Sequence, residues 1–304
     1  MDEYKRVFKS AKLRKWLLEF TSFIPDKYML KLQYRIKLGR KLELKNPVRY
    51  TEKLQWYKLY YHDPIMHQCV DKYKVRKFVK SKGLGNILVK LYGRYNSIED
   101  VEWKKLPDRF VVKTTNGGGG VNVVICRDKS RLDVKSIQEK ISGGGERIKP
   151  HSGGREWAYY GLKKKIIIEE LLENSTNPYA GVNDYKIFCY NGEPEYIIVD
   201  VDRYIDHKRN FYDVKWNNLH IKSDCPEADK PIECPPKFEK MLEIAKKLAE
   251  GFPYVRVDLY NVSGKIYFGE MTFYPWSGYV QFMPDSFDYK LAEKFILPIQ
   301  GREK

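Results

Sequence analysis

Residues 255–272 read VRVDLYNVSGKIYFGEMT, two β-rich runs joined by a Ser-Gly turn, and this predicts an antiparallel hairpin. Alternation along the strands places Arg256 and Asp258 on one face of the first strand. It likewise places Glu270 and Thr272 on one face of the second strand, beside them. Two carboxylates held in this way repel each other unless a cation lies between them. The pair therefore predicts a Mg²⁺ site completed by nucleotide phosphates, with Arg256 against a phosphate oxygen. The alternative is a solvated pair of carboxylates near a salt-bridging arginine.

A second stretch, FVVKTTNGGGGVNVVI (residues 110–125), places four consecutive glycines between two β-rich runs. With no side chains in the way, backbone N–H groups can close over an anion, and Lys113 ends the preceding strand as a fixed cation. The stretch predicts a phosphate clamp, and an ordinary flexible hairpin loop is the alternative. It is neither a Walker A loop nor a dinucleotide-binding fingerprint, because no GK[ST] follows and no GxGxxG opens a helix. The glycines are Gly117, Gly118, Gly119 and Gly120.

A third stretch, IIIEELLE (residues 166–173), is an apolar strand that turns into two glutamates. Its backbone edge groups and flat apolar wall suit an adenine ring, although many edge strands have the same composition. The stretch therefore supports a nucleotide site only together with the other two.

The rest of the chain predicts the α+β class. The first 85 or so residues have apolar residues three or four apart, few glycines and breaks at Pro25, Pro47 and Pro64, as in a mainly helical region. After them, short β-rich runs alternate with helical segments, and Asn191-Gly192 and Ser263-Gly264 predict antiparallel hairpins. The β-rich runs are 87–89, 110–113, 121–125, 166–169, 185–188, 196–199, 255–258 and 266–268, and the helical segments are 132–142, 237–250 and 288–297.

Two other stretches predict loops. Residues 203–236 have weak periodicity and several prolines, which predicts a long insertion. Residues 143–155 are rich in glycine and predict a mobile surface loop. The histidines show no spacing typical of a zinc site or a catalytic triad, so we expect structural or exposed roles for His62, His67, His151, His207 and His220.

The charge distribution narrows the class of partner. The chain has 304 residues and a net charge of +16; residues 1–100 carry +14 of it, with 24 Lys+Arg against 10 Asp+Glu. Such a field suits nucleic acid, an anionic membrane or an acidic polymer. We expect no nucleic acid partner, because the chain has no zinc-finger, RNP or KH signature. Residues 4–20 place apolar residues at helical spacing with basic residues between them. This predicts an amphipathic helix that lies either on an anionic leaflet or on the protein's own core.

Composition also bears on location. No stretch approaches the roughly 18 apolar residues that span a bilayer, and charges throughout the first 20 residues leave no apolar signal-peptide region. Five widely spread cysteines with no CxxC pair fit neither a disulfide framework nor a zinc site. We therefore expect reduced thiols in a cytoplasmic protein, with peripheral contact at the inner face of the membrane as the one membrane role left open. The cysteines are Cys69, Cys126, Cys189, Cys225 and Cys234.

Taken in order, these elements resemble an ATP-grasp enzyme over roughly residues 65–298. That family has a lysine early on a helix, a lysine-ended strand with a Gly-rich loop, a hinge strand ending in an acidic residue, and an RxD strand paired with an ExN strand. The endings at 210–213 and 268–275 most resemble the TupA-like branch, which is associated with teichuronopeptide and surface-polysaccharide biosynthesis. The matching elements are Val70-Asp71-Lys72, Val112-Lys113 with Gly117 to Gly120, Ile168-Glu169-Glu170-Leu171-Leu172, Asn183-Asp184-Tyr185-Lys186, Arg256-Val257-Asp258 and Glu270-Met271-Thr272.

The resemblance implies an ATP-grasp fold, in which two α+β subdomains clasp ATP, here preceded by a basic helical region. We expect that region at 1–85, the small lobe with the Gly-rich loop at 86–172, and the large lobe with the Mg²⁺-binding strands at 173–304. On the small lobe, the resemblance implies that Lys72, Lys113 and Gly117 to Gly120 contact the ATP phosphates, and that Glu169, Glu170 and Leu172 hold adenine at the hinge.

On the large lobe, the resemblance implies that Asp258 and Glu270 hold Mg²⁺, and that Arg256 and Lys113 act on the transferring phosphoryl group. Asp184 would lie near the ribose, with Lys186 on the same face of its strand. Thr272 stands where many ATP-grasp enzymes have Asn, so its part as a metal ligand is open; its hydroxyl can still coordinate Mg²⁺.

The implied activity is an ATP-dependent carboxylate-amine ligase that works through an acyl phosphate. The acceptor would be an acidic sugar of a cell-surface polysaccharide or its precursor, drawn to the basic first third, and the donor an amino acid or amine. An ATP-dependent kinase of a sugar hydroxyl and a non-catalytic or glycosyltransferase-like glycan-binding protein are the alternatives. Candidate acceptor contacts are Arg203, His207, Lys208 and Arg209.

Overall fold

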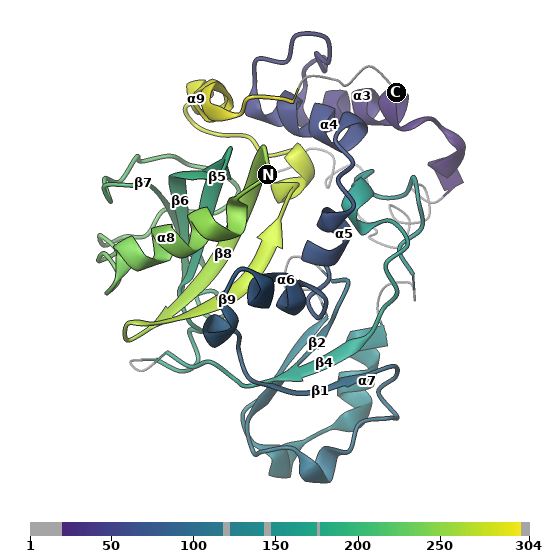
Figure 1. Cartoon of the computed structure of the whole chain (residues 1–304), viewed down its shortest axis with the longest axis vertical. Helices are drawn as coiled ribbons and strands as arrows, with labels where there is room; N and C mark the ends of the chain where they lie inside the picture. Colours follow the sequence, from purple (N-terminus) through teal and green to yellow (C-terminus); the bar gives the residue numbers. More distant parts are fainter. Residues whose placement is uncertain (1–19, 118–121, 143–146, 175–176, 299–304) are drawn as a thin grey trace.

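The computed structural model describes residues 20–117, 122–142, 147–174 and 177–298 (Figure 1). The predicted amphipathic helix of residues 4–20 lies outside these ranges except for Phe20. Gly118, Gly119 and Gly120 of the predicted phosphate clamp also lie outside them.

The N-terminal region is helical, as its apolar spacing predicts. Helix α3 buries Leu30, Tyr34 and Leu38 against Trp56 of the next helix, and it ends at Gly39, whose φ of 71° is the left-handed conformation that closes many helices. The elements of this region are the 3₁₀ turn η1 (Thr21–Phe23), α3 (Asp26–Leu38), α4 (Tyr50–Tyr60), α5 (Ile65–Cys69), α6 (Val75–Ser81) and the 3₁₀ turn η2 (Gly85–Ile87).

A four-stranded antiparallel sheet follows, with strand order β1-β4-β2-β3. Helix α7 covers one face of this sheet with Ile137 and Ile141, which pack on Val112 and Ile168. Its opposite face carries Lys113 and Glu169 and lies toward the rest of the molecule (Figure 1). The elements are β1 (Leu91–Tyr95), η3 (Trp103–Lys105), β2 (Phe110–Thr114), β3 (Val123–Cys126), η4 (Lys129–Arg131), α7 (Val134–Ser142), η5 (Trp157–Tyr159) and β4 (Ile166–Glu169).

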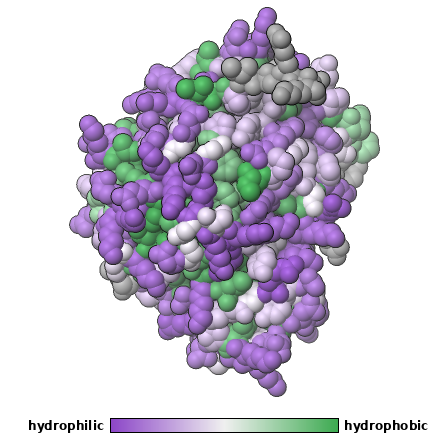
Figure 2. Space-filling model, viewed as in Figure 1, coloured by the Kyte–Doolittle hydropathy of each residue, from purple (hydrophilic) through white to green (hydrophobic). Residues whose placement is uncertain are grey.

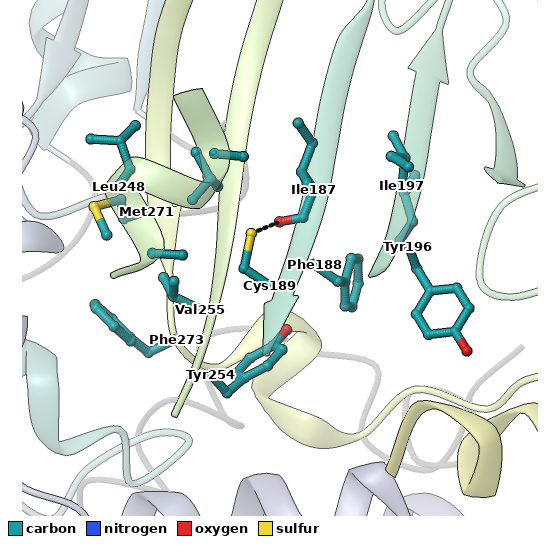
Figure 3. Close-up of a cluster of buried hydrophobic side chains, with 14 of the residues drawn as sticks. Ile187, Phe188, Cys189, Tyr196, Ile197, Leu248, Tyr254, Val255, Met271 and Phe273 are labelled. Carbon is teal, nitrogen blue, oxygen red and sulfur yellow. Dashed lines mark hydrogen bonds between the residues drawn. The ribbon is translucent and has the colours of Figure 1, made fainter. Parts of the chain in front are cut away.

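A five-stranded antiparallel sheet forms the second half, with strand order β7-β6-β5-β8-β9. Helix α8 packs Leu248 and its other apolar residues on one face, around Ile187, Val255 and Met271 (Figure 3). The elements are β5 (Asp184–Tyr190), β6 (Glu193–Val201), β7 (Lys208–Asp213), α8 (Phe238–Ala249), β8 (Tyr254–Val262), β9 (Lys265–Thr272), η6 (Pro275–Gly278) and α9 (Ser286–Lys294). Two antiparallel sheets with helices confirm the predicted α+β class, and the hairpins β5–β6 and β8–β9 confirm both predicted turns.

Three sequence predictions are wrong. Residues 87–89 are not a strand; the strand is β1 at Leu91–Tyr95, at the edge of the sheet, and its pairing with β4 is irregular between Leu91 and Gly93. The predicted loop 203–236 contains strand β7, whose charged residues hide its strand character. Part of the glycine-rich stretch is anchored, because Arg155 is 1% exposed and its guanidinium lies 2.8 Å from Asp26.

None of the helices in the described parts of the chain is both long and apolar enough to cross a bilayer. All five cysteines are free thiols, and four of them are buried.

Candidate active site

The hairpin of β8 and β9 sets the centre of the site. Asp258 lies directly opposite Glu270, and Arg256 lies directly opposite Thr272. Gly269 makes this register: it is an extra residue, a β-bulge, between the pairs Leu259–Phe268 and Asp258–Glu270. The bulge breaks the alternation, so that Phe268 turns into the core while Glu270 faces Asp258 on the other side of the sheet.

Arg256 binds every acidic or hydroxyl group of this set. Its Nε lies 2.7 Å from Oδ1 of Asp258, and its Nη2 lies 2.6 Å from Oδ2. The same Nη2 lies 3.3 Å from Oγ1 of Thr272 and 3.5 Å from Oε1 of Glu270. Thr272 in turn donates its hydroxyl to Glu270 at 3.2 Å. The guanidinium is therefore the cation that balances the two facing carboxylates.

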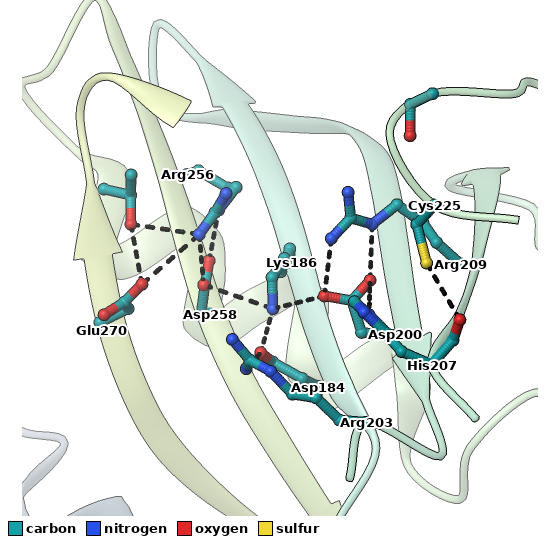
Figure 4. A network of polar contacts seen from close by, with 12 residues as sticks. Asp184, Lys186, Asp200, Arg203, His207, Arg209, Cys225, Arg256, Asp258 and Glu270 are labelled. Carbon is teal, nitrogen blue, oxygen red and sulfur yellow. Dashed lines mark hydrogen bonds and ion pairs between the residues drawn. The ribbon is translucent and has the colours of Figure 1, made fainter. Parts of the chain in front are cut away.

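Lys186 extends the charges across the sheet (Figure 4). Its ammonium is ion-paired with Asp184 on its own strand and lies 3.2 Å from Asp200 and 3.8 Å from Asp258. One carboxylate oxygen of Asp184 is buried and has no hydrogen-bond partner among the described residues. A buried acceptor without a donor is costly, so a ligand hydroxyl or cation is the group that this oxygen lacks. We call the charged residues that lie together on this face the charge row: Asp184, Lys186, Asp200, Arg209, Arg256, Asp258 and Glu270.

Burial shifts the carboxyl pKa values at the β8–β9 end of the charge row. Asp258 is 2% exposed, and this burial raises its pKa from 3.8 to about 7 against the opposing fields of Arg256 and Lys186. Burial acts the same way on Glu270, but Lys72 and Arg256 outweigh it and hold the pKa of that carboxyl below its usual value. Asp258 thus gains most from an added cation.

The four-stranded sheet brings Lys113 and Glu169 to the site, and the segment just before α6 brings Lys72. The Lys113 ammonium lies 3.1 Å from Glu169, whose other oxygen lies 3.0 Å from Arg76 on α6. Lys72 donates to the carbonyl of Gly117 in the Gly-rich loop, and its ammonium also lies 3.9 Å from Glu270. Lys72 therefore links the Gly-rich loop of one sheet to the metal-site strand of the other.

Other predicted site residues lie apart from the charge row. The N–H of Glu170 donates to the carbonyl of Lys90 at 2.9 Å, and Leu172 is half-buried just beyond β4. Each candidate acceptor contact already lies against a carboxylate: Arg203 against Asp184, His207 and Arg209 against Asp200, and Lys208 against Asp206. Arg209 is 7% exposed, so it braces the sheet and is closed to an acceptor.

Sequence reasoning missed Arg76 and Asp200. Arg76 holds both Glu169 and the carbonyl of Val89, at 2.9 Å, and so fixes α6 to the hinge strand. Asp200 is 1% exposed, and side-chain nitrogens of Lys186, His207 and Arg209 lie within 3.2 Å of its carboxylate. Asp200 lies opposite Asp184 because the β5–β6 register shifts between Phe188 and Cys189; counted back from the Asn-Gly turn, Asp184 would face Val199, so neither Asp200 nor Arg76 left a sequence signal.

The donor set fits a hard cation held partly by its ligand. No three His, Cys, Asp or Glu side chains converge as a ready-made metal cluster within the described ranges. Two carboxylates and the Thr272 hydroxyl do converge, all oxygen donors. Mg²⁺ in nucleotide enzymes is held by one or two carboxylates together with phosphate oxygens and water, so this set fits Mg²⁺ bound with ATP.

A cavity of about 700 Å³ lies between β3, α7 and the segment that follows β4. Arg109 and Arg127 line it and pair with Glu173 across it, and the exposed ring of Tyr179 stands over Arg127. None of the predicted site residues lines this cavity. The chemistry of the charge row therefore does not depend on it.

Comparison with protein families matches residues 52–296 to the family described as TupA-like ATP-grasp. This match covers most of the chain and confirms the resemblance that the sequence elements carry. No curated protein matches the chain.

Several solved structures are similar in fold. D-alanine–D-alanine ligase from Bacillus anthracis is 21% identical over 67% of this chain and 57% of its own, with a TM-score of 0.40. The Helicobacter pylori enzyme of the same name is 16% identical over 76% and 61%, with a TM-score of 0.42. An N5-carboxyaminoimidazole ribonucleotide synthetase is 17% identical over 73% and 50%, with a TM-score of 0.41. The chain thus spans a little over half the length of the first two ligases.

Proposed function

The chain belongs to the TupA-like ATP-grasp family, and we propose on this basis that it is a carboxylate-amine ligase driven by ATP. ATP-grasp enzymes are ligases that use ATP and Mg²⁺. The observation that carries the proposal is the convergence of Arg256, Asp258, Glu270 and Thr272, with Lys72 reaching Glu270 from the Gly-rich loop side.

The proposed reaction has two steps. An oxygen of the acceptor carboxylate attacks the γ-phosphorus of ATP, ADP leaves, and an acyl phosphate forms. The amine then attacks the acyl carbon, loses a proton and expels inorganic phosphate, which leaves an amide. Bound Mg²⁺ would neutralise phosphate charge between Asp258 and Glu270.

The protein's own groups position and balance charge. Asp258 and Glu270 would hold the metal, Arg256 beside them would stabilise the transferring phosphoryl group, and Lys113 and Lys72 would meet other phosphate oxygens. Asp184 offers its unpartnered oxygen to a ribose hydroxyl. In this proposal Glu169, Glu170 and Leu172 would hold adenine, and the glycines 117–120 would supply backbone N–H groups to the phosphates. Lys186 keeps Asp184, Asp200 and Asp258 from repelling one another.

The proposed acceptor is an acidic sugar of a surface polysaccharide or its precursor, and the donor is an amino acid or amine. The family assignment and the net charge of +14 in residues 1–100 support this choice, because a basic field concentrates anionic substrates. We place the reaction in the cytoplasm, where ATP is available. The division into 1–85, 86–172 and 173–304 remains part of the proposal.

The first experiment tests the nucleotide site by calorimetry with a non-hydrolysable ATP analogue and Mg²⁺. We expect Mg²⁺-dependent binding by the wild type and none by Asp258→Asn/Glu270→Gln. The matched control is Asp229→Asn/Glu193→Gln, whose side chains are 87% and 57% exposed, and it should bind normally. No binding by folded wild type would overturn the proposal.

The second experiment identifies the products formed from ATP, uronic-acid oligosaccharides and a mixture of amino acids. A ligase releases free phosphate and yields an amide, seen as a mass increase of the amine less one water. A phosphoester without free phosphate would instead identify a kinase of a glycan hydroxyl.

A further inference from the structure

Helix α3 exposes apolar side chains along one line. Tyr28, Leu32 and Ile36 are 64%, 51% and 45% exposed, and they are spaced four residues apart, so they lie on one face. Phe23, in the turn before the helix, is 75% exposed. Figure 2 shows an apolar patch at the right-hand edge of the molecule, where α3 begins in Figure 1. We call Phe23, Tyr28, Leu32 and Ile36 the apolar stripe.

This stripe is not needed for the fold. The opposite side of α3 supplies Leu30, Tyr34 and Leu38 to the core, and each is at most 5% exposed. Both faces of α3 are therefore apolar, and only one is buried in the protein. An exposed apolar face of this kind indicates a contact with a partner or a membrane.

Basic side chains run directly beside the stripe. Lys27, Lys31 and Arg35 each precede one residue of the stripe and are exposed. Successive helix residues are 100° apart, so the basic line and the apolar line are neighbours along the whole helix. No carboxylate of the described residues pairs with these three; Arg35 donates only to the carbonyl of Gly39, at 3.1 Å.

The acidic group on this helix is already neutralised. Asp26 lies 2.8 Å from the buried guanidinium of Arg155 and 3.0 Å from His151. The exposed face of α3 is therefore purely basic and apolar, which is the composition of helices that lie in the plane of an anionic membrane surface.

We propose that the exposed face of α3 docks on an anionic lipid bilayer, with the apolar stripe among the acyl chains and Lys27, Lys31 and Arg35 at the headgroups. Charge complementarity selects this occupant: a second copy of the same face would bring six like charges together. The proposal does not depend on the nucleotide site, which lies between the two sheets.

Vesicle co-sedimentation with the full chain tests the proposal. We expect binding to vesicles that contain phosphatidylglycerol, weak binding to phosphatidylcholine alone, and weakening by salt. Leu32→Ser/Ile36→Ser should lower the partition coefficient about tenfold or more, since both residues insert. Lys27→Gln/Lys31→Gln should lower it about fivefold per lysine, on phosphatidylglycerol vesicles only.

The matched control is Val134→Ser/Ile205→Ser, which removes two apolar side chains that are 36% and 57% exposed on other elements. Val134 begins α7, at the opposite end of the molecule from α3 (Figure 1). This control should bind vesicles like the wild type, and all variants should keep the wild-type midpoint of urea denaturation, which verifies their fold.

Three results would overturn the proposal: no binding of wild type to anionic vesicles, equal binding by Leu32→Ser/Ile36→Ser, or a wild-type dimer that this double variant converts to a monomer in sedimentation analysis. The last result would assign the stripe to self-association.

Discussion

The two ends of the charge row use the same kinds of side chain in opposite ways. At the β6–β7 end, Asp200 accepts two hydrogen bonds from Arg209, at 2.6 and 3.1 Å, and Lys186 and His207 each lie 3.2 Å from its carboxylate. At the β8–β9 end, two carboxylates share chiefly one guanidinium, and Glu270 keeps 34% of its side chain exposed.

The pKa values follow this difference. Burial acts to raise the pKa of both aspartates, but hydrogen bonds and charges from His207, Lys186 and Arg209 hold the pKa of Asp200 well below its usual range. At Asp258 burial prevails and raises the pKa to about 7. We call a carboxylate saturated when several cationic or hydrogen-bonding side chains surround it, as at Asp200, and undersaturated when it shares its cation with another carboxylate, as at Asp258. A saturated carboxylate stabilises the sheet, whereas an undersaturated one retains the capacity to bind a further cation.

The largest expected effect is at the undersaturated end. Asp258→Asn keeps the shape of the side chain but removes the charge that a metal requires. We expect ATP turnover to fall by about 10² to 10³-fold or more, with the fold intact. Steady-state ADP release measures this effect, and a rate within tenfold of the wild type would contradict the assignment of Asp258.

At the saturated end, a substitution should lower the stability of the protein rather than its rate of ATP turnover. Asp200→Ala leaves Arg209 and Lys186 buried without their shared partner, and we expect the free energy of unfolding to fall by about 3–5 kcal/mol. Urea denaturation measures it. Asp200→Leu/Arg209→Leu, which removes both charges, should lose less than the single variant; an equal or larger loss would mean that packing rather than charge is involved.

The two aspartates should also give stability opposite pH dependences in metal-free protein. Asp258 keeps its proton in the native state from pH 3.8 up to about 7, so its contribution to stability falls as pH rises through that window. Asp200 contributes stability that is lost as pH falls below 3.8. Each slope is at most about 1.4 kcal/mol per pH unit.

Denaturation between pH 3 and 8 with a chelator tests these signs. Asp258→Asn should gain stability relative to the wild type as pH rises toward 7. Asp200→Asn should be less stable than the wild type near neutral pH, and this difference should disappear at low pH. The same slope in both variants would refute the comparison.

The smallest effect is expected at Thr272. Thr272→Asn replaces one neutral oxygen donor by another, so the half-saturating Mg²⁺ concentration should change by less than about tenfold, roughly 1.4 kcal/mol. Thr272→Val, which has the same shape but no oxygen, should change it more. Equal effects of the two variants would remove Thr272 from the metal shell.

The parts of the fold that could be predicted depend on local signals. The turns at Asn191-Gly192 and Ser263-Gly264 were sufficient to predict both hairpins, but counting back from Ser263-Gly264 pairs Asp258 with Gly269, so the pairing of Asp258 with Glu270 depends on the bulge, which the sequence did not predict. The edge strands β1 and β7 were missed because their sequences, LYGRY and KRNFYD, lack an apolar run. Such strands form because a neighbouring strand pairs with them.

The site could be predicted only where the type and spacing of its residues indicate their chemistry. Carboxylates on a hairpin indicate a cation, but the neutralisation of Arg203, His207 and Arg209 depends on Asp184 and Asp200, whose positions follow from strand pairing. The anchoring of Arg155 to Asp26 joins residues 129 positions apart, and no periodicity reports such a contact.

The bulge restricts position 269 to glycine. A Cβ placed there would lie 2.9 Å from the carbonyl oxygen of Asp258, which is backbone and cannot turn aside. Any other residue would push β9 from β8 and move Glu270 away from its partner. We therefore expect position 269 to be as invariant among relatives as the two carboxylates, although glycine takes no part in the chemistry.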